Sequence, residues 1–167
     1  RHPSMFAMVQ DGPMDGPPQM ERWVLDPARG FSSTVLDERA QEFPRIDERH
    51  TGMRHRYGWA AGASIADLGS TDAEIEGSVL RYDLDAGTVD AVGLGPGRVG
   101  GEFVFVPDAD DAGEGEGWLL GYVADLASGT SELLVLDAGS MATQARVRIP
   151  RRIPAGFHGN WVPDSAL

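Results

Sequence analysis

Three strand–turn–strand units recur along the chain, and they constrain its fold more than any other feature. In each unit an aromatic residue in a β-rich run is followed by an Asp, a short turn that contains Gly and a second β-rich run, which is the pattern of an antiparallel hairpin. A chain organised in this way is predicted to be all-β. The strands of the three hairpins are expected at residues 20–25 and 31–36, 79–84 and 88–92, and 118–124 and 130–136.

The spacing of these units favours a propeller. Asp85 and Asp125, which open the turns of the last two units, are 40 positions apart, within the range of one four-stranded propeller blade. Asp26 and Asp85 are 59 positions apart, so we expect an insertion between them, and the small, polar, acidic stretch 64–76 is the candidate. We therefore predict a partial β-propeller. A β-sandwich or an ordinary meander remains an alternative for the same hairpins.

A Glu-Phe pair follows each of the first two hairpins. Glu42 comes 16 residues after Asp26, Glu102 comes 17 residues after Asp85, and each is followed directly by Phe. In a propeller the first strand of each blade lies nearest the central axis, so these two glutamates would face the axial channel and point toward one place. The alternative is that both are solvated residues at strand starts.

His158 is the histidine whose surroundings suggest a site. It follows a run interrupted by Pro150 and Pro154, and Gly156 and Gly159 flank it, which allows the backbone to approach another group closely. We interpret His158 as a metal ligand, with a hydrogen-bonded core histidine as the alternative. The remaining histidines, none of which shows the spacing of a zinc protease, are His2, His50 and His55.

Two further stretches are expected to be structural. Residues 108–116 hold five acidic residues without the fixed spacing of a calcium loop, so we predict a hairpin tip. Residues 54–59 alternate like a strand, which places His55, Tyr57 and Trp59 on one face. These aromatic residues are expected to line the core or a channel.

Composition excludes several classes of function. The length of 167 residues is that of about one domain. The 14 basic and 26 acidic residues leave a formal charge of −12, which argues against nucleic acid and against an anionic membrane surface as partners. The chain has no cysteine, which excludes disulfides and favours a cytoplasmic setting. No apolar run approaches the ~18 residues of an integral membrane segment.

Six stretches, taken in this order, resemble the C-terminal part of the carotenoid cleavage oxygenase family. This family includes apocarotenoid oxygenases, lignostilbene dioxygenases and the retinal pigment epithelium isomerase. The resemblance covers nearly the whole chain and rests on residues 41–47, 56–59, 101–107, 117–120, 132–138 and 154–159. It implies a strand and turn-rich connector over residues 1–18 and C-terminal propeller blades over residues 19–167. These would be about the last three blades of a seven-bladed propeller.

The resemblance also implies a metal site. The family binds Fe2+ on the propeller axis through four histidines, three of which are hydrogen-bonded to glutamates. By resemblance His158 is the last of the four ligands, and Glu42 and Glu102 match two of the three glutamates. This agrees with the chemistry of such sites, because a ligating imidazole needs an acceptor for its other N–H, and neutral imidazoles suit iron.

The implied reaction is the oxidative cleavage of a conjugated C=C bond by O2, which gives two carbonyl products. The substrate would be an apolar polyene (a carotenoid or apocarotenoid) or a stilbene, with Tyr57, Trp59 and Phe103 as candidate lining residues. This chain holds only one of the four expected ligands, and the others are expected upstream. Alone, it is expected to be inactive and, through open strand edges, to favour a homo-oligomer.

Two other functions remain open at this stage. The first is a non-catalytic β-propeller module that serves binding or assembly. The second is a propeller hydrolase of sugars or lactones, for which Glu42 and Glu102 would be a catalytic carboxylate pair about 5–10 Å apart. The position of His158 relative to the two glutamates distinguishes the metal site from the hydrolase.

Overall fold

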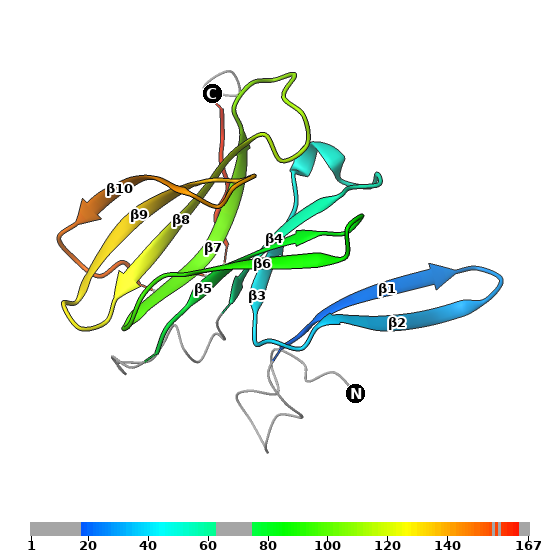
Figure 1. The fold of residues 1–167 in the computed structure, drawn as a ribbon, viewed down its shortest axis with the longest axis horizontal. Coiled ribbons are helices and arrows are strands. Elements are labelled where there is room, and N and C mark those ends of the chain that lie inside the picture. The colour runs from blue at the N-terminus through cyan, green and yellow to red at the C-terminus, as the bar shows by residue number, and fades with distance from the viewer. Residues whose placement is uncertain (1–17, 63–74, 155, 157, 164–167) are drawn as a thin grey trace, which may run out of the picture.

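The computed structural model of the protein describes residues 18–62, 75–154, 156 and 158–163 (Figure 1). Nearly all regular structure in these ranges is β, as predicted, and the exception is a short 3-10 helix, Glu48–His50. The predicted connector lies outside the described residues except for Pro18, and most of the stretch 64–76 also lies outside them. The strands are β1 (Met20–Asp26), β2 (Gly30–Asp37), β3 (Glu42–Arg45), β4 (Tyr57–Gly62), β5 (Ser78–Asp83), β6 (Thr88–Gly93), β7 (Arg98–Pro107), β8 (Gly117–Asp125), β9 (Thr130–Asp137) and β10 (Thr143–Ile149).

Within the described ranges, the strands form two four-stranded antiparallel meanders and one hairpin. Strands β3-β4-β5-β6 make one sheet, called here the first blade, and β7-β8-β9-β10 make the second blade. The β1–β2 hairpin projects away from the first blade (Figure 1). Two complete blades preceded by a hairpin confirm the prediction of a partial propeller of about three blades. In the described part of the chain, no helix has the length and apolar character needed to cross a bilayer.

The predicted hairpins are present, but the blade period inferred from them is wrong. The turn at Asp85 joins the third and fourth strands of the first blade, whereas the turn at Asp125 joins the second and third strands of the second blade. The two turns are therefore not equivalent, and their 40-residue spacing is not a repeat. The Asp-to-Gly pattern suits any tight antiparallel turn and carries no information on the position within a blade.

The two blades pack face to face around a large hydrophobic cluster. Trp59 of β4 is 1% exposed and stacks on Phe105 of β7, with ring centroids 5.0 Å apart and planes at 5°. Its Nε1 donates a hydrogen bond to the carbonyl of Ala138. Phe103 is equally buried in this core. Trp59 and Phe103 are thus core residues, and the expectation that they line a substrate channel is wrong. Tyr57 is half-buried, beneath the guanidinium groups of two arginines.

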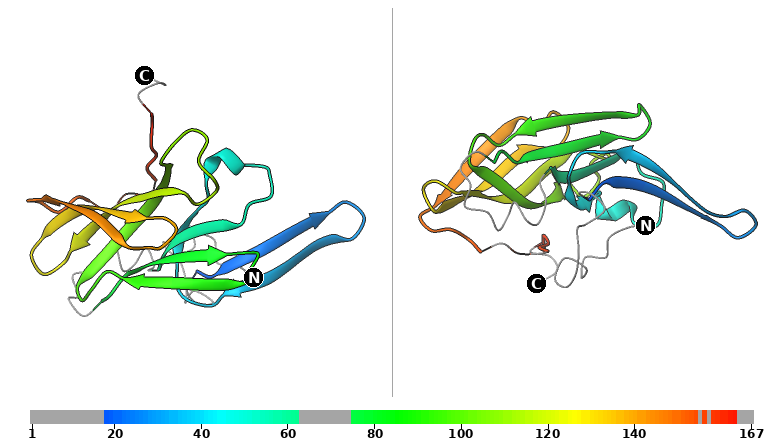
Figure 2. Two further views of the ribbon diagram at one scale, coloured as in Figure 1. Left: turned by 45° about the horizontal axis from the view of Figure 1, so that its top comes forward. Right: turned by 90° about the horizontal axis from the view of Figure 1, so that it is seen from below.

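The first strands of the two blades are in contact, and this contact positions the candidate site. Strand β7 contacts β3, β4 and β5, and a small buried cluster of Phe43, Ala61 and Val99 fills the space between the blades. A second view shows the blades as neighbouring layers (Figure 2). Because β3 carries Glu42 and β7 carries Glu102, both predicted glutamates lie on first strands.

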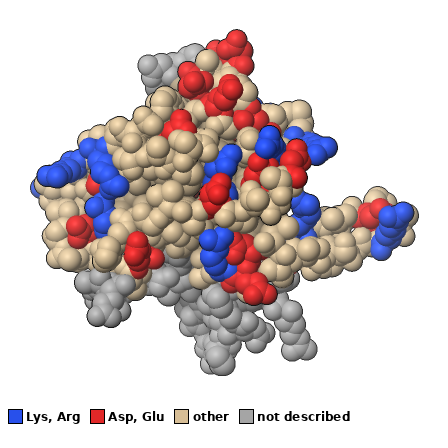
Figure 3. Space-filling view, in the orientation of Figure 1, with Lys and Arg blue, Asp and Glu red and all other residues tan. Residues whose placement is uncertain are grey.

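The acidic stretch 108–116 is the loop between β7 and β8, as predicted for a hairpin tip. Acidic side chains gather at the top of Figure 3, where this loop lies. One of them binds the first blade, because Glu114 Oε1 accepts hydrogen bonds from the backbone N–H groups of Arg56 and Tyr57, at 2.6 and 2.7 Å. Arg49 donates a further bond to the carbonyl of Asp110. The loop therefore fastens the second blade to the first.

Candidate metal centre

Both predicted glutamates lie at irregularities in their strands. The register of β3 shifts between Glu42 and Arg45, and that of β7 shifts between Gly100 and Phe103. Such bulges bend a strand and redirect side chains, and they are common beside functional sites. In β3 the residue after Glu42, Phe43, has φ of 55°, in a region that non-glycine residues seldom adopt. Each Glu-Phe pair thus lies at an irregularity in the first strand of its blade.

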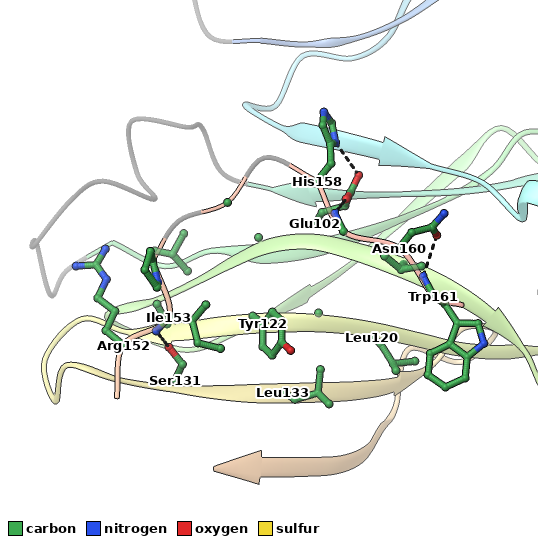
Figure 4. A pocket seen from close by; sticks show the side chains of 18 of the residues that line it. Glu102, Leu120, Tyr122, Ser131, Leu133, Arg152, Ile153, His158, Asn160 and Trp161 are labelled. Carbon is green, nitrogen blue, oxygen red and sulfur yellow. Dashed lines mark hydrogen bonds and ion pairs between the residues drawn. The ribbon is translucent and has the colours of Figure 1, made fainter. Parts of the chain in front are cut away.

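Glu102 holds the C-terminal segment through both of its oxygens. Its side chain is only 6% exposed, and Oε1 lies 3.2 Å from Nδ1 of His158 (Figure 4). Its Oε2 accepts a hydrogen bond of 2.7 Å from the backbone N–H of Gly159. An ionised carboxylate only accepts hydrogen bonds, so Nδ1 must carry the imidazole proton to bond it. The neutral ring then presents Nε2 as an unprotonated nitrogen, which is the form that binds a metal.

The segment that carries His158 leaves the second blade because proline ends β10. Pro150 follows Ile149 directly, and proline has no N–H to continue the strand pairing. The segment then crosses the open face of the second blade, where the N–H of Ile153 donates to Ser131 Oγ at 2.9 Å. Beneath it lies a groove of about 470 Å³, whose lining includes Val104, Leu120, Tyr122, Leu133 and Trp161 (Figure 4).

His158 is exposed within the described part of the chain. Its side chain is 71% exposed there, so the described residues do not enclose it. The ring of Phe43 meets the imidazole edge-on, with centroids 6.0 Å apart and planes at 87°. His158 is therefore held on one side by Glu102 and on another by Phe43, and it remains accessible.

The other predicted residues are distributed as follows. Glu42 is half-buried at the bulge of the neighbouring first strand. His50 Nε2 lies 4.0 Å from the carboxylate of Asp47 in the 3-10 helix, and His55 lines a groove between the β1–β2 hairpin and the first blade. His2 lies outside the described residues. Within the described ranges, no cluster of three or more His, Cys, Asp or Glu could hold a metal. His158 alone would be one ligand of a larger set.

Sequence reasoning missed two residues that complete the site. Arg45 donates from Nη1 to Glu102 Oε1 at 3.2 Å and from Nη2 to Asn160 Oδ1 at 3.1 Å. Both residues lie in or beside stretches that carry the family resemblance, but nothing in the local pattern marks them. Their role depends on a contact between segments 115 positions apart, which only the packed structure shows.

A family profile described as retinal pigment epithelial membrane protein matches residues 2–163. The chain belongs to this family, that of the carotenoid cleavage oxygenases. A carotenoid cleavage oxygenase of Mycobacterium tuberculosis is 36% identical over 99% of this chain. A lignostilbene-alpha,beta-dioxygenase (isozyme III) of Sphingomonas paucimobilis is 31% identical over 97% of it.

The solved structures of the carotenoid cleavage oxygenase family share the fold. A cobalt-substituted apocarotenoid oxygenase of Synechocystis superposes with a TM-score of 0.76 at 29% identity, over 87% of this chain. The chain spans about a third of the relatives it matches: 33% of the Mycobacterium tuberculosis protein, 36% of the Sphingomonas protein and 30% of the Synechocystis structure. The matched region is the C-terminal part of the relatives, as the resemblance implied.

Proposed function

We propose that this chain forms part of an Fe2+-dependent dioxygenase that cleaves a conjugated C=C bond of a carotenoid, apocarotenoid or stilbene with O2, giving two carbonyl products. The observation that carries the proposal is the contact between His158 Nδ1 and the buried carboxylate of Glu102. It is the arrangement that orients a metal-binding imidazole. The printed names of the relatives supply the reaction class, namely carotenoid cleavage and lignostilbene dioxygenation.

The residues present would supply one of the four histidine ligands of an iron site. His158 would bind the metal through Nε2, while Glu102 accepts the Nδ1 proton. Glu42 would do the same for a second histidine, because it also lies at an irregularity in the first strand of its blade. The remaining ligands would come from outside the described residues. When bound, Fe2+ would supply the activation of O2, a reaction that side chains of this chain do not perform.

The contribution of this chain is orientation. Glu102 keeps the proton of His158 on Nδ1 and, through Gly159, fixes the backbone one residue further on. The Phe43 ring packs against the imidazole at nearly a right angle. Carboxylates that bond the ligating histidines, and not the metal itself, would offset the metal's charge and leave coordination positions open for O2 and substrate.

Two alternatives are less well supported. A propeller hydrolase would need Glu102 open to substrate, but this carboxylate is nearly buried and bonds His158, Gly159 and Arg45. A non-catalytic module is compatible with the fold, but gives no reason for a buried carboxylate that holds an exposed imidazole. A measurement of metal binding distinguishes the non-catalytic module from the enzyme.

The test uses the gene product that carries this sequence, loaded with Fe2+ under anaerobic conditions. It is then exposed to O2 with an apocarotenal or a hydroxylated stilbene, and the two carbonyl products are quantified by mass spectrometry. We expect product from the wild type and from His50→Ala, and none from His158→Ala. Equal product from His158→Ala, or none from the iron-loaded wild type with either substrate class, would refute the proposal.

A further inference from the structure

Arg45 joins three elements of the candidate site. Its guanidinium donates to Glu102 Oε1 on β7 and to Asn160 Oδ1 on the C-terminal segment, and it forms an ion pair with Glu48. The side chain is 16% exposed although it is charged. We propose that Arg45 is a positioning residue of the His158 site, one that fixes the Glu102 carboxylate and the C-terminal segment relative to the first blade. This inference rests on the proposed function.

The contact with Glu102 acts on the atom that orients the imidazole. Oε1 of Glu102 accepts from Arg45 Nη1 at 3.2 Å and meets His158 Nδ1 at the same distance. Glu102 Oε2 is held separately by the Gly159 N–H. Without Arg45, Oε1 would lose its guanidinium donor and keep its contact with the imidazole, while Oε2 would keep the Gly159 N–H. The carboxylate could then turn about its last bond and carry Oε1 away from Nδ1.

The contact with Asn160 acts on the segment two residues beyond His158. Asn160 Oδ1 accepts from Arg45 Nη2 and from the backbone N–H of Trp161, at 3.1 and 2.9 Å. Its Nδ2 donates to Glu48. Because the described residues after β10 belong to no strand, such side-chain bonds help to hold them in place. The two residues that follow His158 are therefore both held, Gly159 by Glu102 and Asn160 by Arg45.

Arginine suits this position better than lysine. The planar guanidinium presents several N–H donors in a fixed fork, so one side chain can hold Glu102, Glu48 and Asn160 in set directions. The two carboxylates also balance its positive charge, which limits repulsion between Arg45 and a metal cation bound at His158. A lysine ammonium would retain the charge but not the fork.

The test compares Arg45→Met with Arg54→Met in the gene product. Arg54 also forms an ion pair, with Asp85, but its side chain is 85% exposed and lies outside the site. Two quantities are measured: the affinity for Fe2+ and the visible absorption of the Co2+-loaded protein, since a Synechocystis relative accepts cobalt. For Arg45→Met we expect about tenfold weaker metal binding, which is the lower end of the loss in affinity seen when a residue that supports a metal ligand is removed. We also expect an altered Co2+ spectrum. Arg54→Met is expected to behave as the wild type.

A further set of variants keeps the two proposals separable. Arg45→Lys, which keeps the charge, is expected to fold and to recover part of the affinity, whereas a purely structural role predicts full recovery. If His158→Ala abolishes metal binding while Arg45→Met and Arg45→Lys match the wild type in affinity and spectrum, the positioning role is wrong and the proposed function stands. If His158→Ala leaves metal binding unchanged, both are wrong. If Arg45→Met does not fold, Arg45→Lys and Asn160→Ala are used instead. The inference is overturned if both of these variants have the metal affinity and the Co2+ spectrum of the wild type.

Discussion

Oε1 of Glu102 lies 3.2 Å from Nδ1 of His158, although the two residues are 56 positions apart in the sequence. The contact joins the first strand of the second blade to a segment that has already left that blade. The Glu102 carboxylate is nearly buried, and hydrogen bonds from Arg45 and from the Gly159 N–H compensate its burial. We propose that the contact between Glu102 and His158 orients His158 for metal binding.

Replacing Glu102 by Gln tests the carboxylate directly. The amide has nearly the same shape but no charge, and only one of its two ends can accept a hydrogen bond. We expect Fe2+ affinity of the gene product to fall by about 10- to 100-fold, as for other outer partners of metal-binding histidines. The matched control is Glu76→Gln, whose carboxylate accepts from the Gly95 N–H and does not contact the site. Equal affinities of the two variants, measured by metal titration, would contradict the role of Glu102.

The interface between the blades should depend on Trp59. Truncation of this buried, stacked side chain to Ala removes a large apolar group and leaves a cavity, which costs about 3–5 kcal/mol of unfolding free energy. Trp23→Ala is the control, because Trp23 is 57% exposed on the β1–β2 hairpin. Denaturant unfolding should show a large loss for Trp59→Ala and little change for Trp23→Ala. Similar losses would mean that the blades do not pack as described.

A tight contact beside Glu102 yields a third prediction. A methyl group added at Gly121 would lie 2.7 Å from the ring of Phe103. Phe103 directly follows Glu102 on β7. Gly121→Ala is therefore expected to lower the unfolding free energy by about 1–3 kcal/mol through overpacking. At Gly139 the added methyl meets its nearest atom at 3.5 Å, so Gly139→Ala should be tolerated. If thermal unfolding shows the two variants to be equally stable, the packing of Phe103 on β8 is incorrect.

Acid should destabilise the fold through paired carboxyl groups. Hydrogen bonds from Arg56 lower the pKa of Asp83 below its ordinary value of 3.8. Burial opposes ionisation of Asp47, but hydrogen bonds from the Arg49 side chain and backbone outweigh it, so the pKa of Asp47 is also lowered. The unfolded chain then binds protons at higher pH than the folded chain does. Stability is fully present above about pH 5 and is lost as pH falls through the lowered pKa values.

The acid prediction is checked by melting temperatures between pH 7 and the acid range. The melting temperature of the wild type should fall steadily once the carboxyl groups begin to take up protons. Asp47→Asn removes one of the groups, so its melting temperature should start lower at neutral pH and decline less on acidification. A decline in the variant as steep as that of the wild type would show that Asp47 does not contribute.

Local chemistry determines how much of this structure was predictable. Hairpin turns depend on a few neighbouring residues, so the strands around Asp26, Asp85 and Asp125 were predicted nearly to their ends. The order of strands within a blade depends on long-range pairing, and the same turn pattern misled the choice of repeat. The Glu-Phe pairs were informative because a bulge in the first strand demands a specialised local sequence. The Arg45–Asn160 contact was invisible, since it exists only once both blades and the C-terminal segment have packed.

The central claim is that His158 ligates iron, and elemental analysis tests it most directly. The gene product that carries this sequence is loaded anaerobically with Fe2+ and analysed beside His158→Ala, His50→Ala and the 167-residue chain alone. We predict near-stoichiometric iron in the wild type and in His50→Ala. We predict loss of iron in His158→Ala and no stoichiometric iron in the 167-residue chain. A wild-type gene product that stays free of iron, or a His158→Ala variant that retains it, would contradict the claim.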